Sequence, residues 1–438
     1  MPSDFKMAKV KPLYKKNKQT DVGNYRPVSI LNIVSKVLEK AIYVQLENYL
    51  VQNSLLYKYQ SGFRQSFSTD SCLIHLLDFI KCQSSRGLYT GMVMLDLQKA
   101  FDTVNHDILL EKLKAMGLES VEWFRSYLSE RTQVVTIGKT ISEPLNVTCG
   151  VPQGSLLGPL LFLCYINDME ISVDSDCKLL LYADDSAILF SHKDPDVIAT
   201  KLGCVLDSCN RWLVDNKLSL HLGKTECVIY GSRRKLKKVS DFKVECAGHT
   251  IIAQKSVKYL GIEIDQHVSG EDVANYVLRK ANARLKFLYR QSAYLDHNCR
   301  KLLCSALIQC LFDYASCSWF AGLNQKFKNK LQITQNKMVR FITNRGPRTH
   351  VGQQERSQIG YLNVADRVKC LRSCHAHKIF YNSCAPYLQE HFDKVSEVHR
   401  YNTRSSNYNF RVPKTKGSAS STFFNCAIHD WNSLPDEI

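Results

Sequence analysis

The sequence predicts an α+β protein, in which a small group of short strands is followed by a long helical region. Apolar residues run from Leu179 to Phe190 around two adjacent carboxylates, which is typical of a β-hairpin with acidic residues at its turn. Met92 to Leu95 form another short apolar run, which indicates a buried strand. From Asp272 onward the apolar residues recur at the helical period instead.

The chain is long enough for two or three modules and is strongly basic. It has 438 residues, 45% of them hydrophobic, and 58 Lys and Arg against 41 Asp and Glu give a net charge of +17. Such an excess favours a polyanionic partner, with nucleic acid ahead of a membrane surface. The 17 cysteines are scattered, and the Lys-rich start has no apolar signal segment. We expect a reduced, intracellular protein of the nucleus or cytoplasm that is neither secreted nor membrane-bound.

Near the N-terminus, a stretch rich in Lys and Arg precedes a segment that is predicted to be extended. Seven Lys and Arg lie between Lys6 and Arg26, and a proline then favours extended backbone at residues 25–30. Basic residues on two strands and their loop can hold a phosphate chain, and Arg26 can do so with a bidentate fork. For Lys15 and Lys16 a solvated basic loop is an equally good interpretation. A helix is predicted for residues 29–50.

A buried strand that ends on a carboxylate is the next informative feature. Residues 60–64 form a Gly-containing loop, and Ser68 is placed to cap a helix with an apolar face. The strand at 92–95 ends on Asp96, a position that is poor for stability and favourable for a site. Asp102 is expected to cap or brace the helix predicted from Asp107 to Met116 rather than to bind a metal.

A tight loop and a second β region complete the first part of the chain. Residues 150–155 read Gly-Val-Pro-Gln-Gly-Ser, and their two glycines allow the backbone and one amide to approach a ligand. After the acidic hairpin, residues 194–216 are predicted to be helical. Residues 218–230 are predicted to be a strand pair that carries Lys224, and residues 257–264 are the last β segment.

The remaining sequence is helical and basic, then polar. An apolar helix is predicted from Leu302 to Trp319, between two stretches that each hold seven Lys and Arg. Such a bundle with one cationic side suits a nucleic-acid duplex. Cys370, Cys374, His375 and His377 suggest a zinc site, but no second ligand pair has the usual spacing, so packed thiols are the favoured interpretation.

The order of these pieces indicates phosphoryl transfer. A strand that ends in Asp96 and a hairpin that carries Asp184 and Asp185 could place carboxylates on neighbouring strands. Two divalent cations about 3.5–4 Å apart can stabilise the attacking and leaving oxygens of such a reaction. Mg²⁺ prefers a few carboxylates, water and substrate phosphates.

In this order the motifs resemble those of LINE-type (non-LTR retrotransposon) reverse transcriptases, over about residues 11–265. Any one motif is a weak signal, whereas seven in family order are specific. They are NYRPVS at 24–29, QSGFR at 60–64, LDLQKAFD at 95–102, GVPQGS at 150–155, YADD at 182–185, GKTE at 223–226 and YLGI at 259–262. The tail from Thr403 through residues 431–435 also resembles the end of some such elements.

The resemblance implies a role for each matching residue. Asp96, Asp184 and Asp185 would bind two Mg²⁺ ions, with Mn²⁺ as a substitute, and the Leu97 carbonyl would be a further ligand. Lys224 would be a general acid, and Phe101 a gate against the 2′-hydroxyl of ribonucleotides. The other positions would bind nucleotide or nucleic acid: Lys15, Lys16, Arg26, Gln153 and Gly154 the incoming nucleotide, Gln60, Gly62 and Arg64 the template, and Tyr259, Leu260 and Gly261 the primer.

The implied architecture is a right-hand polymerase, with an RNA template, a DNA or RNA primer and deoxynucleotides as partners. Fingers are expected at 1–90, a palm with further fingers elements at 91–265, and a basic helical thumb at 266–345; residues 346–438 have no expected role. The chain is expected to lack the endonuclease of full-length elements. Two alternatives stay open: a catalytically idle, nucleic-acid-binding relic, and an RNA-dependent RNA polymerase, against which Phe101 argues.

Overall fold

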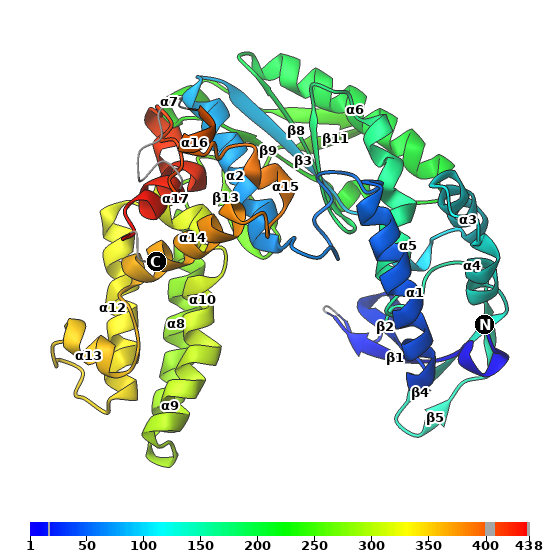
Figure 1. Ribbon diagram of the computed structural model, residues 1–438, viewed down its shortest axis with the longest axis horizontal. Coiled ribbons are helices and arrows are strands. Elements are labelled where there is room, and N and C mark those ends of the chain that lie inside the picture. Colours follow the sequence, from blue (N-terminus) through cyan, green and yellow to red (C-terminus); the bar gives the residue numbers. More distant parts are fainter. Residues whose placement is uncertain (16–17, 399–407, 436–438) are drawn as a thin grey trace.

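The computed structural model describes residues 1–15, 18–398 and 408–435. Two arms extend from a central sheet, and the N-terminus lies in one arm while the C-terminus lies beside the other (Figure 1). The described chain mixes helices with short sheets, and it is the α+β right-hand architecture predicted from the sequence. Of the residues singled out above, Lys16 and the start of the resembling tail at Thr403 lie outside the described ranges.

The central sheet, the palm, has the strand order β7-β8-β3-β9, and all its pairs are antiparallel. Successive side chains of a strand point to opposite faces of the sheet. In this sheet the side chains on both faces are apolar, and each face is covered by a helix. Val93 and Leu95 pack with α6 on the outer face, whereas Met92 packs with α2 on the inner face. The palm elements are β3 (Tyr89–Leu95), β7 (Lys178–Tyr182), β8 (Asp185–His192), β9 (Glu226–Tyr230), α2 (Thr69–Ser85) and α6 (Pro195–Asp215).

The fingers form the arm that holds the N-terminus. A small sheet joins β1 to β2 in antiparallel and to β4 in parallel pairing, and α1 runs beside it. The helix predicted at 29–50 is present as α1, although its apolar residues Ile33, Val34 and Val37 are 78%, 54% and 71% exposed. The fingers elements are β1 (Met7–Tyr14), β2 (Tyr25–Ile30), β4 (Arg131–Ile137), β5 (Thr140–Ile141), β6 (Leu145–Val147), α1 (Ile33–Gln52), α3 (His106–Ala115), α4 (Val121–Leu128) and α5 (Gly158–Ile166).

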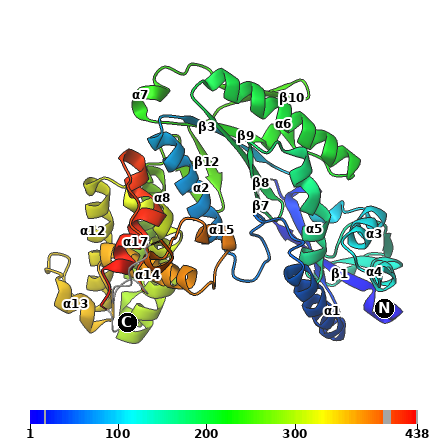
Figure 2. The same ribbon diagram turned by 45° about the horizontal axis from the view of Figure 1, so that its top comes forward.

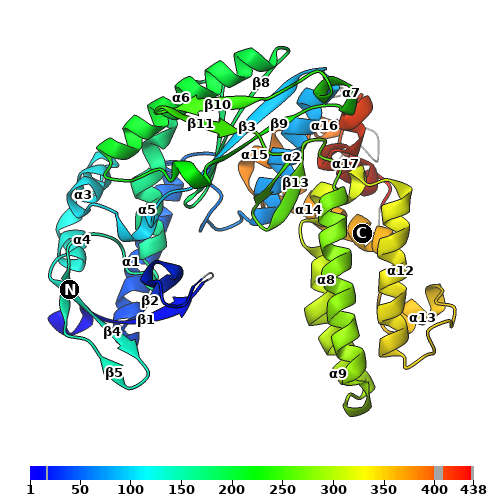
Figure 3. The ribbon, with the colours of Figure 1, turned by 180° about the vertical axis from the view of Figure 1, so that it is seen from behind.

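The thumb is the opposite arm, in which α8 and α12 run side by side (Figure 3). The single apolar helix predicted at 302–319 is wrong, because the chain breaks at Ala315, whose φ is +52°. By length and composition His297–Gly322 could cross a membrane, but half of its most apolar window is buried in the protein. The elements here are β12 (Ser256–Tyr259), β13 (Ile262–Asp265), α8 (Glu271–Arg290), α9 (His297–Cys304), a π-helical turn (Ser305–Gln309), α10 (Cys310–Asp313), α11 (Ser316–Trp319) and α12 (Gln325–Ile342).

The C-terminal region packs against one side of the thumb and against the palm helix α2 (Figure 2). Its core gathers aromatic residues of α17 and the preceding loops against Ile74 of α2. Cys370 and Cys374 are exposed on α14, so the expectation that they are packed thiols is wrong. The remaining elements are α7 (Arg233–Leu236), β10 (Lys243–Cys246), β11 (His249–Ile252), α13 (Gln353–Gln358), α14 (Val364–Phe380), α15 (Pro386–Gln389), α16 (Val395–Val398) and α17 (Phe423–Asn432).

Candidate active site

Three carboxylates lie at one end of the palm sheet. In the β3–β8 ladder Leu95 is opposite Ser186, so the next residue, Asp96, falls beside Asp185. Tyr182 pairs with Asp185 to close the β7–β8 turn, which leaves Ala183 and Asp184 as its two central residues. The predicted hairpin is therefore present, with Asp184 in the turn and Asp185 already at the start of β8.

Burial and nearby negative charge raise the pKa of two of these carboxylates, Asp184 and Asp185. Burial raises the pKa of Asp185 to about 6, and the negative charges of Asp184 and Asp96 contribute to the rise. Burial also raises the pKa of Asp184, and the Asp96 charge adds to it. Part of the Asp185 side chain still reaches solvent, so a ligand can approach it. Repulsion of this kind is what a bound cation relieves.

Positive charge from the fingers faces these carboxylates. The positive charges of Arg26 and, more weakly, Lys15 offset part of the rise in the pKa of Asp184. Arg26 pairs with Leu13 in the β1–β2 ladder, and the Lys15 N–H donates to the Asn24 carbonyl just beyond it. Cations opposite a cluster of carboxylates could neutralise a polyphosphate that lies between them.

Lys224 also reaches the acidic cluster. Its Nζ lies 3.6 Å from Oδ2 of Asp96. The prediction that a strand carries Lys224 is wrong, because the residue ends a 3₁₀ turn, Leu222–Lys224, just before β9. Both side chains are about half exposed, so this ion pair adds little to stability. The ammonium group is instead available to a ligand at the carboxylates.

The backbone at Leu97 is oriented for a further contact. The Asp96 carbonyl accepts from the His221 N–H at 2.8 Å, and the Gln98 N–H donates to the Ser219 carbonyl at 2.9 Å. In antiparallel pairing the residue between two such bonds directs its own N–H and carbonyl to the opposite side. The Leu97 carbonyl therefore lies on the β8 side of the strand, where Asp185 is.

The donor atoms suit magnesium through their chemistry. Within residues 1–15, 18–398 and 408–435, no three His, Cys, Asp or Glu side chains are arranged to hold a metal ion as they stand. The backbone nevertheless brings the hard oxygen donors of Asp96, Asp184 and Asp185 together at one end of adjacent strands. Rotation of these short side chains is enough to change where their oxygens point. Carboxylates of this kind, with a backbone carbonyl, are the ligands that Mg²⁺ prefers.

Phe101 lies next to this site on a short 3₁₀ turn after Asp96. Its ring stacks on Phe162 of α5, with centroids 4.4 Å apart and planes 28° apart. Phe63 meets the same ring edge-on at 6.2 Å. The ring is half-buried and held from two directions, so it offers a rigid apolar surface.

The Gly-Val-Pro-Gln-Gly loop is fixed against both the palm and the fingers. Gln153 donates from Nε2 to Oδ1 of Asp102 at 2.8 Å, and its carbonyl accepts from the Ser29 N–H at 2.8 Å. Asp102 therefore braces this loop, whereas Asn105 caps α3 by accepting from the Ile108 N–H. Gly154 has a φ of +133°, and a Cβ there would lie 2.3 Å from the Ser29 carbonyl oxygen.

The loop at 60–64, predicted to contact the template, instead holds the acidic turn. Gln60 is only 2% exposed, and its Oε1 accepts from the N–H groups of Gly62 and Ala183, both at 2.9 Å. A Cβ on Gly62 would lie 2.5 Å from the Ala183 nitrogen. Arg64 donates to the carbonyls of Tyr57 and Gln60, so it braces its own loop. Among these residues, sequence reasoning missed the contact between Gln60 and the acidic turn.

The hairpin predicted to hold the primer is tied to the thumb. Tyr259 is buried, and its hydroxyl lies 3.7 Å from the sulfur of Cys72, so its side chain faces the core rather than a primer. Leu260 and Gly261 form the β12–β13 turn with φ values of +43° and +84°. Tyr314, at the end of α10, donates to the Leu260 carbonyl and lies against Gly261.

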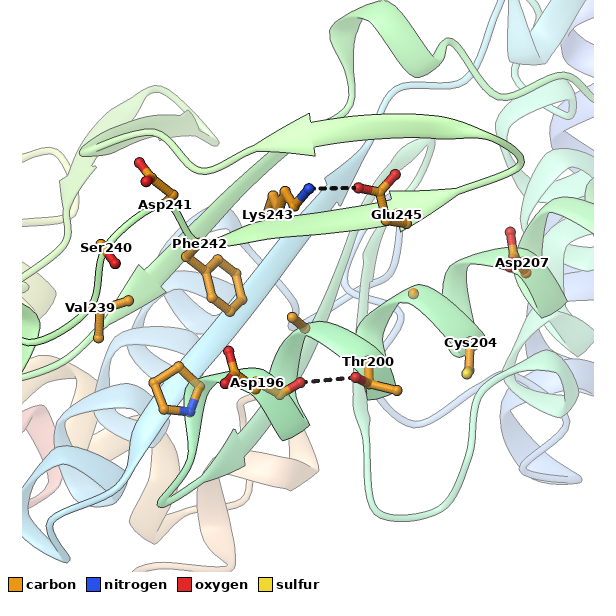
Figure 4. A pocket seen from close by; sticks show the side chains of 13 residues that line it. Asp196, Thr200, Cys204, Asp207, Val239, Ser240, Asp241, Phe242, Lys243 and Glu245 are labelled. Atoms are coloured by element: carbon orange, nitrogen blue, oxygen red, sulfur yellow. Dashed lines mark hydrogen bonds and ion pairs between the residues drawn. The ribbon is translucent and has the colours of Figure 1, made fainter.

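A cavity of about 510 Å³ lies on the outer face of the palm, between α6 and the β10–β11 hairpin (Figure 4). Phe242 and the ion pair between Lys243 and Glu245 line it. The cavity contains none of the residues predicted to bind metal, nucleotide or nucleic acid. The predicted site residues therefore lie outside this cavity.

Known proteins resemble the chain over the same region. A family model described as "Reverse transcriptase (RNA-dependent DNA polymerase)" matches residues 14–264. The "Probable RNA-directed DNA polymerase from transposon BS" of Drosophila melanogaster is 27% identical over 359 residues, which are 78% of this chain and 39% of that protein. The "RNA-directed DNA polymerase from mobile element jockey" of the same fly is 29% identical over 354 residues, 78% of this chain and 38% of that protein.

The chain therefore spans about two fifths of the length of these curated relatives. Among solved structures, an apo telomerase from Candida tropicalis is similar with a TM-score of 0.43 and 13% identity, over 78% of this chain and 64% of that one. The family model covers more than half of the chain, and it includes each predicted metal ligand. The chain belongs to the reverse transcriptase family, in its LINE-type, non-LTR branch.

Proposed function

We propose that this chain is an RNA-directed DNA polymerase, which adds deoxynucleotides to the 3′-hydroxyl of a DNA or RNA primer on an RNA template. The observation that carries the proposal is the β3–β8 register. It places Asp96 beside Asp185 at the acidic turn, while Arg26 and Lys15 act on Asp184 from the fingers. In a two-metal transfer of a nucleotide the carboxylates would hold the ions, and the basic groups would neutralise the phosphates.

Each group has a distinct part in the reaction. Asp96, Asp184, Asp185 and the Leu97 carbonyl would hold two Mg²⁺ ions, which Mn²⁺ could replace. When bound, these ions would make the primer hydroxyl a better nucleophile and neutralise charge on the phosphates. The fork of Arg26 would hold the triphosphate, and Nζ of Lys224 would give a proton to the departing pyrophosphate.

The nucleotide would be selected by the surface around Phe101. Its stacked ring is too rigid to yield to a 2′-hydroxyl, so ribonucleotides would be excluded. The backbone of the loop at Gly154 lies close to Ser29 of the fingers and would position the base and sugar from the other side. The proposed place of action is the nucleus or the cytoplasm.

Primer extension tests this proposal. The chain is incubated with an RNA template, an annealed DNA primer, deoxynucleotides and Mg²⁺. We expect template-directed extension by the parent and a loss of roughly a thousandfold or more in Asp184→Asn, because one carboxylate is neutralised with little change of shape. Asp241→Asn is the matched control, since Asp241 is an exposed carboxylate beside the cavity on the outer face of the palm, away from the acidic turn.

The same assay separates the alternatives. Full activity in Asp184→Asn would show that the reaction does not depend on these carboxylates. Salt-sensitive binding of primer–template by the parent without any extension would identify a nucleic-acid-binding relic. Extension with ribonucleotides in preference to deoxynucleotides would identify an RNA polymerase.

A further inference from the structure

The C-terminal region reaches the support of the acidic turn through one tyrosine. Tyr387 lies in α15, is only 1% exposed, and packs in the same apolar cluster as Ile74 of α2. Its ring is 4.8 Å from the ring of His75 and 5.7 Å from that of Tyr59. A residue more than 200 positions beyond the acidic turn is thereby buried beside the loop that holds it.

The Tyr387 hydroxyl bridges two serines in a directed chain of hydrogen bonds. It lies 2.8 Å from Oγ of Ser61 and donates to Oγ of Ser71 at 3.2 Å. Ser71 in turn donates to the Ser68 carbonyl at 2.8 Å, and its Oγ accepts from the Ser68 N–H in the capping box of α2. Because Tyr387 donates to Ser71, its oxygen is left to accept from Ser61. All three hydroxyls at this junction are buried, so each bond matters.

Ser61 connects this chain to the acidic turn. The Ser61 N–H donates to the Leu181 carbonyl at 2.8 Å, and the Leu181 N–H donates to the Tyr59 carbonyl at 3.1 Å. Between these bonds, Gln60 accepts from the N–H of Ala183. Ala183 has a φ of +56°, a strained conformation for this residue type, so the turn needs such support.

We infer that Tyr387 is a positioning residue for the polymerase reaction. Its hydroxyl fixes Ser61, which fixes Gln60, which fixes the backbone N–H immediately before Asp184. Tyr387 touches no substrate and acts only through this loop. The inference rests on the proposed function, and it gives the C-terminal region a part in setting the geometry of the acidic site.

Removal of the hydroxyl alone tests this role. Tyr387→Phe keeps the ring contacts, whereas Tyr381→Phe changes a 57% exposed tyrosine of the same region and is the control. In Tyr387→Phe we expect amide hydrogen exchange at Ala183 to become about three- to tenfold faster, because one buried hydrogen bond is lost from the support. We expect the same change in Ser61→Ala and no further change in the double variant.

Kinetics provide a second readout. In Tyr387→Phe we expect kcat to fall about three- to tenfold and the Mg²⁺ concentration for half-maximal extension to rise by about the same factor. The KM for primer–template should stay unchanged, because no nucleic-acid contact is removed. The melting temperature should remain close to that of Tyr381→Phe.

Each possible result of these measurements either supports or overturns the proposed role of Tyr387. Unchanged exchange at Ala183 in a folded Tyr387→Phe would overturn the inference, whether or not the parent polymerises. A parent without extension activity would refute the proposed function, while faster exchange at Ala183 would still support the structural connection. A loss of kcat that merely follows a lower folded fraction would show that Tyr387 only anchors the C-terminal region.

Discussion

At the scale of single residues, Phe101 is the side chain whose chemistry can be tested most simply. In Phe101→Ala the ring that stacks on Phe162 is gone, and space opens beside the proposed sugar position. We expect discrimination against ribonucleotides, measured as the ratio of kcat/KM for dNTP and rNTP, to fall roughly ten- to a hundredfold. Phe287→Ala, on the exposed side of α8, should leave the ratio unchanged. Equal discrimination in both variants would remove Phe101 as the gate.

Gly154 tests the contact between the palm loop and the fingers. Its φ of +133° and the 2.3 Å separation from a Cβ to the Ser29 oxygen leave no room for a side chain. We expect Gly154→Ala to lower the free energy of unfolding by about 2 kcal/mol or more, measured by urea denaturation. Gly346→Ala is the control, because a Cβ at Gly346 meets only Thr349 at 3.6 Å. Equal stability of the two variants would contradict the close contact.

The positions of the three carboxylates could be predicted from the sequence, because local patterns of apolar residues reveal where strands end. The partners of Gln60 and Gln153 could not. Gln60 bonds to Ala183, 123 positions away, and Gln153 bonds to Asp102, 51 positions away. Such contacts depend on the assembled sheet, and a single sequence carries no periodic signal for them.

At the scale of elements, the contact between α2 and α17 depends on one buried carboxylate. Asp78 accepts from the N–H groups of Phe423 and Phe424, and Lys81 donates to the carbonyls of Ser318 and Ser421. Burial is the largest influence on Asp78 and raises its pKa to about 6, from an ordinary value of 3.8. The folded protein therefore holds a proton on Asp78 over a pH range in which the unfolded chain has released it.

This difference gives a pH dependence with a defined sign. The stability that protonated Asp78 contributes is fully present below about pH 4 and is lost as the pH rises through about 6. Urea denaturation of the parent and of Asp78→Asn between pH 4 and 7 isolates this contribution. We expect the parent to lose stability relative to the variant as the pH rises. A relative gain would mean that the α17 N–H groups and Lys81 stabilise the charged form more than burial opposes it.

Two predicted helices show where the spacing of apolar residues predicts the secondary structure and where it does not. The helix at 194–216 was predictable because its apolar stripe faces one sheet, and α6 spans nearly the same residues. The helix predicted at 302–319 is divided, because Tyr314 turns to donate to the Leu260 carbonyl and Ala315 adopts a left-handed conformation. In this segment a contact with the β12–β13 turn outweighs helix propensity.

At the scale of the whole molecule, the C-terminal region is part of the folded core. Without it, the Ile74 side of α2 would lose its aromatic neighbours, Asp78 would lose the N–H groups of Phe423 and Phe424, and Lys81 would lose the Ser421 carbonyl. Exposing this apolar surface to water is strongly destabilising. We expect a chain that ends at residue 345 to bind a hydrophobic dye and to lose cooperative thermal unfolding. Removal of residues 436–438 alone is the control, and a truncated chain that melts like the parent would contradict this dependence.

The central claim is that carboxylates of two palm strands hold cations against the reacting phosphate. It is tested most directly by RNA-templated incorporation of a deoxynucleoside α-thiotriphosphate, compared in Mg²⁺ and in Mn²⁺. Because sulfur is a softer ligand that Mn²⁺ accepts better than Mg²⁺, we expect one diastereomer to react roughly tenfold or more slowly in Mg²⁺ and to recover in Mn²⁺. Equal slowing in both metals, or no incorporation on RNA at all, would contradict the account.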